Sequence, residues 1–409
     1  MTLNGTHILV LNDGSRYENW GIKACIDGLL KSLYDSIPKC QIEGLPHEYM
    51  HKRYVWEPKI MGKKLINENS RIARRFLSNY HMLPRIADEF DYVADLWDRG
   101  KGGVGAKDFI TCAKRNDVIV FNAEGSTYRD NIGAIKGLFM LWYAKTRMQK
   151  RCYFMNGSVT LTLVDSTLPA MVHKVFGVVD GVAVREPYSF RSVLNWFPEL
   201  NLTMIPDSVF GLDIADYVPI KEINLAFLEK PFFCFSLSML PMDFRLTKDK
   251  SSIVAVIKEL KNIVPTAVLL AKDDEDQLLK EVAQLTDSYF VGPEFSYLDI
   301  SYILSKATFL FSGRYHHLIF ATKVGCPIIP MASSSHKIHG LAELFDELSP
   351  SPIDPTDLWE AKNIILKAAS DIIHLQNVRS KYYDRSALLR DTVQRQVKQL
   401  MGRQGISSN

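Results

Sequence analysis

The densest group of residues that could carry chemistry lies at 309–341, FLFSGRYHHLIFATKVGCPIIPMASSSHKIHGL. Its pattern predicts a strand that ends at Gly313, followed by an apolar helix that opens with Arg314 and Tyr315. The start of such a helix presents free backbone N–H groups and the positive end of the helix dipole, which favour a bound phosphate or carboxylate. The Arg314 guanidinium can hold either anion through two hydrogen bonds. We therefore expect an anion site at this strand end.

Two adjacent histidines, His316 and His317, compete for the role of general acid beside this anion. An imidazole titrates near neutral pH and can protonate a leaving phosphate or a developing carbanion. Neighbouring residues of an α-helix point about 100° apart, so at most one of the two should face the ligand. On placement alone, a structural hydrogen bond explains His316 as well as catalysis does.

The loop SSSHKIHG, residues 333–340, follows the next predicted strand at its carboxyl end. In a sheet of parallel strands this places Ser335, Lys337 and the start of another helix beside the same crevice. Lys337 could hold a phosphate, whereas an ordinary solvated lysine at a helix start is the alternative.

In the first half of the chain, the predicted buried strand within 117–128 ends in Asn122, Glu124 and Gly125. The glycine permits a tight turn and leaves room for a substrate. Glu124 could accept a proton from an acceptor hydroxyl or hydrogen-bond to it, while capping the following helix is the alternative.

Other predicted strand ends of the first half also carry polar side chains. Arg185 ends one strand and is a second candidate anion clamp, with a surface ion pair as the alternative. Asp207 ends another strand, and Asn19 and Trp20 lie at the first strand-to-helix turn. Because parallel strands share one carboxyl edge, we expect these residues to converge.

Short β-rich runs alternate with helix-period segments along almost the whole chain, which predicts an α/β protein with parallel sheets. The pattern restarts after the loop around residue 215, so we expect two Rossmann-like domains that face a central cleft in a GT-B-like arrangement. The predicted boundaries are 1–218 for the first domain, 219–355 for the second and 356–409 for C-terminal packing helices.

Residues 47–101 fit the alternation poorly and read as a mainly helical basic insertion in the first domain, with cations at 52, 53, 59, 63, 64, 71, 74 and 75. A solvated face is the ordinary explanation of such a run. Binding of an anionic glycan or of a membrane surface is the alternative, and the apolar residues of 356–402 leave a similar choice between packing and peripheral membrane contact.

The overall composition excludes several classes of protein. The 49 Lys and Arg residues nearly balance 46 Asp and Glu residues, for a net charge of +3, so we expect no nucleic-acid partner. The six cysteines form no CxxC pair and no metal-ligand spacing, which favours a reducing compartment and no metal site. We find neither a signal-peptide pattern nor an apolar run of spanning length, and we expect a cytoplasmic protein.

Taken together, five segments resemble motifs of the polysaccharide pyruvyl transferase family. In chain order they read NWGI, NAEGST, VREPYS, PDSVF and SGRYHH…CP…SSSHKIHGL. Each motif is weak alone, whereas five in this order, over about residues 8–345, form a specific signal.

The resemblance implies an enzyme that uses phosphoenolpyruvate as co-substrate and no other cofactor. It would move the enolpyruvyl group onto a sugar of a surface or capsular polysaccharide, or of its lipid-linked precursor, to form a pyruvate ketal and release phosphate. By position, Arg185 and Arg314 would grip the carboxylate and phosphate of the donor, and His316 would be the general acid, with Glu124 as its catalytic partner. The remaining positions would be donor-binding at Gly313, Tyr315, Ser335 and Lys337, and acceptor-binding at Asn19, Trp20, Asn122 and Gly125.

Two other functions remain open from the sequence. A glycosyltransferase that uses a CMP- or UDP-sugar is the runner-up, because two Rossmann-like domains around one crevice serve that chemistry as well. A non-catalytic protein that binds glycan or membrane through the basic insertion is the third hypothesis, and it predicts salt-sensitive binding without phosphate release.

Overall fold

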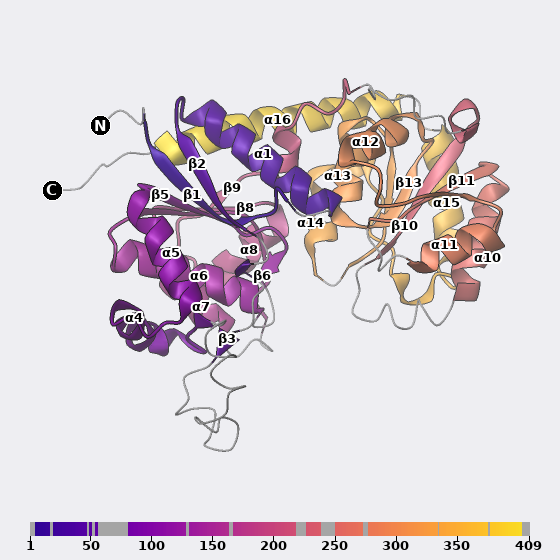
Figure 1. Cartoon of the computed structure of the whole chain (residues 1–409). Helices are drawn as coiled ribbons and strands as arrows, with labels where there is room; N and C mark the ends of the chain where they lie inside the picture. Colours follow the sequence, from indigo (N-terminus) through magenta and orange to yellow (C-terminus); the bar gives the residue numbers. More distant parts are fainter. Residues whose placement is uncertain are drawn as a thin grey trace, which may run out of the picture.

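The computed structural model describes residues 5–16, 19–46, 49–50, 54–55, 81–127, 131–162, 167–217, 226–238, 250–272, 277–333, 335–374 and 377–402. Within these residues, two parallel sheets with helices packed against them form two units side by side (Figure 1). This confirms the predicted α/β class with two Rossmann-like domains.

The first sheet has seven strands, in the order β2-β1-β5-β7-β8-β9, with β6 paired to β7. Its strands are β1 (His7–Asp13), β2 (Gln41–Pro46), β5 (Val118–Asn122), β6 (Ser126–Thr127), β7 (Arg151–Val159), β8 (Gly181–Val184) and β9 (Thr203–Met204). The accompanying helices are α1 (Trp20–Ser36), α4 (Phe90–Asp98), α5 (Val104–Arg115), α6 (Ile132–Thr146), α7 (Leu168–Phe176) and α8 (Pro187–Trp196), followed by the 3₁₀ turn η2 (Ser208–Gly211).

The second sheet has five strands, in the order β12-β11-β10-β13-β14. Its strands are β10 (Phe232–Ser238), β11 (Thr266–Leu270), β12 (Tyr289–Val291), β13 (Leu310–Gly313) and β14 (Ile328–Pro330). The helices are α10 (Lys250–Lys261), α11 (Gln277–Leu285), α12 (Tyr297–Lys306), α13 (Tyr315–Lys323) and α14 (Lys337–Leu344), and then α15 (Lys362–His374) and α16 (Val378–Gly402).

Helices on both faces explain why the central strands read as unbroken apolar runs. Every residue of β5 and of β10 is buried, because a parallel strand in the middle of such a sheet has no solvent face. The edge strand β2 is partly exposed and more polar, and the hydrophobic pattern did not predict it.

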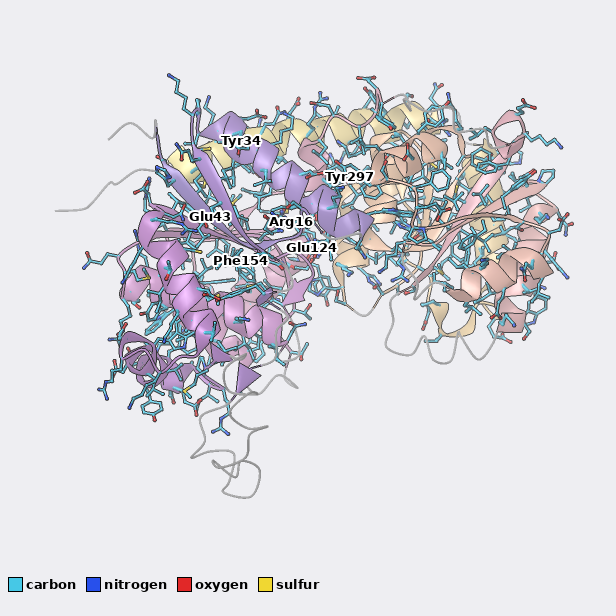
Figure 2. All side chains as sticks on the ribbon, viewed as in Figure 1. Arg16, Tyr34, Glu43, Glu124, Phe154 and Tyr297 are labelled. Atoms are coloured by element: carbon cyan, nitrogen blue, oxygen red, sulfur yellow. The ribbon has the colours of Figure 1, made fainter. Side chains whose placement is uncertain are left out.

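The two domains share one apolar core. A single cluster of buried side chains runs from Trp20 and Leu29 of α1 to Tyr297 of α12 and Leu318 of α13. The Tyr297 hydroxyl also donates to Asp27 of α1 at 2.8 Å, and Figure 2 shows this tyrosine beside α1. The long helix α16 packs against α1, η2 and α13, so it crosses from the second domain back to the first (Figure 1).

The predicted basic insertion can be followed only in part. All eight of its basic positions lie outside the described residues, so the structure does not test that prediction. The described part holds the short parallel strands β3 (Tyr54–Val55) and β4 (His81–Met82), and then α4. Among the described helices, none is long and apolar enough to cross a membrane.

Candidate active site

Arg185 directly follows β8, and its side chain is completely buried at the boundary between the domains. The guanidinium donates through Nε to Ser158 Oγ (2.8 Å), through Nη1 to Asp207 Oδ2 (2.8 Å) and through Nη2 to the Gly125 carbonyl (2.7 Å). Its carbon lies 4.3 Å from the ring centroid of Tyr315, which belongs to the second domain. The alternative of a surface ion pair is therefore wrong, because Arg185 is an interior cation at the domain boundary.

Asp207 holds two parts of the site through one carboxylate. Its Oδ1 accepts from the backbone N–H of Val209 at 3.0 Å and so caps η2. Its Oδ2 binds Arg185 and lies 3.7 Å from His316 Nε2. Burial alone would raise the pKa of Asp207, but the interactions with His316 and Arg185 lower it to about 2. Asp207 is thus an anion at every working pH.

The structure separates the two adjacent histidines. The His316 side chain is 12% exposed and reaches Asp207, and its Nδ1 edge touches α1 at Gly21, where an added Cβ would lie only 2.2 Å away. His317 points into the core, where its Nδ1 bonds to Ser236 Oγ at 3.0 Å and its ring packs 5.2 Å from Trp20. Burial lowers the pKa of His317 well below its usual value, so it packs as a neutral ring.

Lys337, the first residue of α14, brings a further cation to Tyr315. Its Nζ lies 6.0 Å from the Tyr315 ring centroid, on the ring that also contacts Arg185. Burial, together with the charges of Arg185 and Arg314, lowers the pKa of Lys337 to about 8, against the opposing effect of Glu124. The Tyr315 hydroxyl is buried and makes no hydrogen bond within the described part of the chain. Because Arg185 already donates from all three of its nitrogens, the Tyr315 hydroxyl and Lys337 are the groups beside it that can bind an anion directly.

The other donor-side positions lie at the same edge of the second sheet. Gly313 ends β13 where an added Cβ would lie 2.5 Å from Ser238 of β10, so only glycine fits there. Arg314 precedes α13, is 6% exposed, and donates from its backbone N–H to Ser312 Oγ at 2.9 Å. Ser335 lies buried in the loop before α14.

Glu124 follows β5 and is half-buried, and Figure 2 shows it at the edge of the first sheet that faces the second domain. It lines a cavity of about 130 Å³ together with Gly125, Thr127 and Asn131. Gly125 has a φ of +101°, a conformation that side-chain-bearing residues rarely adopt. A carboxylate beside a small cavity of mixed polar and apolar lining can meet a hydroxyl group there.

Three of the predicted acceptor contacts make structural interactions instead. The Asn19 side chain caps α1 by accepting from the backbone N–H groups of Gly21 and Ile22. Trp20 is 2% exposed and donates from Nε1 to the Phe295 carbonyl at 2.6 Å, across the domain boundary. Asn122 is fully buried, and its Oδ1 accepts from Asn156 Nδ2 at 3.2 Å. Neither Trp20 nor Asn122 is open to an acceptor in this structure, because tertiary packing covers both.

Some site residues were not recognised as such from the sequence. Asp207 was noted only as a strand end, since no spacing connects it to His316, 109 positions along. Lys272, two residues after the end of β11, lowers the pKa of Lys337 through its positive charge, and its position near a strand end was the only available signal. Glu186 and His336, which meet between the domains, were likewise not recognised as site residues from the sequence.

The fold also brings Cys25, Asp207 and His316 together, with potential ligand atoms within 4.8 Å of one another. These residues fit a cation poorly. The same Asp207 oxygen that faces His316 already binds the Arg185 guanidinium, and burial, with Asp207 beside it, raises the pKa of the Cys25 thiol well above its usual value.

The comparison with protein families matches the chain, over residues 22–335, to the model described as polysaccharide pyruvyl transferase. No curated protein sequence matches this chain significantly.

Solved structures share the fold at low sequence identity. A UDP-N-acetylglucosamine 2-epimerase from Listeria monocytogenes, titled putative, aligns over 98% of both chains with 9% identity and a TM-score of 0.58. A UDP complex of S. aureus MnaA aligns over 96% of this chain and 94% of its own, with 10% identity and a TM-score of 0.56. A UDP-forming α,α-trehalose-phosphate synthase from Burkholderia xenovorans, in complex with glucose-6-phosphate, aligns over 98% and 99%, with 12% identity and a TM-score of 0.56. These similarities show the two-domain GT-B arrangement.

Proposed function

We propose that this chain, which belongs to the polysaccharide pyruvyl transferase family, transfers the enolpyruvyl group of phosphoenolpyruvate onto two hydroxyls of one sugar. The sugar would belong to a surface polysaccharide or to its lipid-linked precursor. The observation that carries the proposal is the meeting of Arg185, Tyr315 and Lys337 from two domains around one point, with His316 and Asp207 beside it.

The charge of the site supports a small anionic donor. Arg185, Arg314 and Lys337 bring three positive charges, against Asp207 and the half-buried Glu124, which leaves an excess of one positive charge. The carboxylate and the phosphate of the donor would bind these cations through charge-assisted hydrogen bonds. The buried Tyr315 hydroxyl offers a further donor. Phosphoenolpyruvate is its own activated donor, so the proposed reaction needs no additional cofactor.

In the proposed reaction, His316 gives a proton to the methylene carbon, C3, of phosphoenolpyruvate, and C2 becomes an oxocarbenium-like centre. One sugar hydroxyl adds to C2 and loses its proton. The bond from C2 to the phosphate ester oxygen then breaks, and the second hydroxyl adds in its place. The two sugar hydroxyls release two protons. One of them restores the proton that His316 gave to C3, and the other leaves on the phosphate. The products, the ketal and inorganic phosphate, therefore account for all atoms. Glu124 is the proposed base for a hydroxyl, because it lies at the acceptor-side cavity.

The direct test is release of inorganic phosphate from phosphoenolpyruvate in the presence of a panel of sugar acceptors. We expect His316→Gln to lower kcat by roughly 10²–10⁴-fold, the range for loss of a general acid. His173→Gln is the matched control, because this histidine is exposed on α7 and pairs with Glu199. We expect the control to retain full activity.

A binding measurement separates the proposal from its runner-up. Phosphoenolpyruvate should raise the midpoint of thermal unfolding, because a ligand stabilises the state that it binds. Stabilisation by CMP or UDP, with no response to phosphoenolpyruvate and no phosphate release with any acceptor, would replace the proposal by a nucleotide-sugar transferase.

A further inference from the structure

His336, directly before α14 in the second domain, inserts its ring into a polar box that belongs to the first domain. Its Nδ1 lies 2.8 Å from Thr160 Oγ1, and its Nε2 lies 2.9 Å from Ser189 Oγ and 3.1 Å from Glu186 Oε1. The ring stacks on Tyr188, with centroids 4.2 Å apart and planes at 19°. Both ring nitrogens of a nearly buried side chain are thus used across the domain boundary.

Glu186 gives this contact a fixed geometry. Its side chain is fully buried and caps α8, where it accepts from the Ser189 backbone N–H (2.9 Å) and from the Ser189 hydroxyl. Because that hydroxyl donates to Glu186, the His336 Nε2 must carry a proton and donate. On the other side, Gly340 of α14 lies so close to Glu186 that an added Cβ would be 2.2 Å from Oε2.

Each member of this pair is the sequence neighbour of a proposed donor-binding cation. Glu186 follows Arg185 at the end of β8, and His336 precedes Lys337 at the start of α14. Contact between Glu186 and His336 therefore bears directly on how far Arg185 of one domain lies from Lys337 of the other. Other interactions hold the proposed acid, since Asp207 and Gly21 contact His316 and neither belongs to the polar box.

We infer that Glu186 and His336 form an interdomain positioning pair that preassembles the anion site between Arg185 and Lys337, and this inference rests on the proposed function. Without the pair, the two cations would be correctly spaced in only a fraction of molecules. The apparent affinity for the donor is then the intrinsic affinity multiplied by that fraction. At saturating donor concentration, binding draws all molecules into the correctly spaced arrangement. Loss of the pair should thus raise KM for phosphoenolpyruvate and leave kcat nearly unchanged.

Three variants test this pair by steady-state phosphate release with phosphoenolpyruvate. His336→Asn retains a group near Nδ1 but loses the bond to Glu186, and we expect KM to rise about tenfold or more, as for loss of a charge-assisted hydrogen bond. His336→Gln places an amide near Nε2 and should recover part of the affinity. Gly340→Ala pushes α14 away from Glu186 without changing a polar group, and it should raise KM as His336→Asn does.

Glu343→Gln is the control. Glu343 makes an exposed two-point ion pair with Arg191 at the same contact between α8 and α14, and exposed pairs contribute little. Its kinetics should match the wild type. Two results would overturn the positioning role. The first is an unchanged KM in His336→Asn and Gly340→Ala, with only a lower unfolding temperature. The second is a fall in kcat at unchanged KM. Wild-type protein that turns over no phosphoenolpyruvate would instead overturn the proposed function itself.

Discussion

Asp207 Oδ2 lies 3.7 Å from His316 Nε2, so a fully buried carboxylate of the first domain faces a histidine in the first turn of α13 of the second. The same oxygen accepts a hydrogen bond from Arg185 at 2.8 Å. One carboxylate therefore holds a proposed donor clamp and lies beside the proposed acid. Removing it should affect the protein in ways that stability and kinetics can separate.

Asp207→Asn should destabilise the protein in a pH-dependent way. The pKa of Asp207 is lowered from 3.8 to about 2 in the folded state, so its contribution is present above pH 3.8 and is lost as the pH falls toward 2. A shift of this size corresponds to about 2 kcal/mol at neutral pH. This figure already contains the attraction to Arg185, and the total loss on substitution should lie between it and the roughly 3–5 kcal/mol typical of a broken buried pair.

Urea unfolding at several pH values checks this prediction. The difference in unfolding free energy between wild type and Asp207→Asn should be largest near neutral pH and should shrink below about pH 4. Asp213→Asn serves as control, because Asp213 is 57% exposed and pairs with Lys31 and Arg390 at the surface. A difference that does not change with pH would contradict the assigned ion pair.

The affinity for phosphoenolpyruvate should fall at alkaline pH because of Lys337. Its pKa in the free protein is lowered to about 8, so the ammonium loses its proton, and with it the charge that attracts an anion, as the pH rises through that value. KM for phosphoenolpyruvate measured from pH 6.5 to 9.5 should rise above about pH 8. Lys337→Gln should show a high KM without this rise. A wild-type KM that is constant over the whole range would argue against contact between Lys337 and the donor.

Gly21→Ala should damage catalysis more than folding. An added Cβ would lie 2.2 Å from His316 Nδ1, and the ring would have to turn away from Asp207. We expect kcat to fall at least about tenfold, since a displaced acid loses most of its contribution. Gly402→Ala is the matched control, because an added Cβ there meets nothing within 4 Å. Equal activity of both variants would show that His316 tolerates displacement.

Much of this architecture follows from the sequence alone. The short apolar runs that became β5, β10 and β13 indicate buried parallel strands, because helices cover both faces of such a sheet and the runs are too short for buried helices. A polar residue at the carboxyl end of such a strand must lie at one edge of the sheet, and for that reason the places of Arg185 and Arg314 could be predicted. The polar edge strand β2 could not, since its exposed face weakens the pattern.

Tertiary structure decided which side chains meet. By placement alone His316 and His317 compete, and only the family resemblance favoured His316; the packing of α13 against α1 is what turns His317 into the core and His316 toward Asp207. Packing likewise covered Trp20 and Asn122, which the resemblance had assigned to the acceptor. Local periodicity predicts the helices, the strands and the strand ends. Contacts between residues a hundred positions apart depend on how the two domains pack together, and no local sequence pattern contains that information.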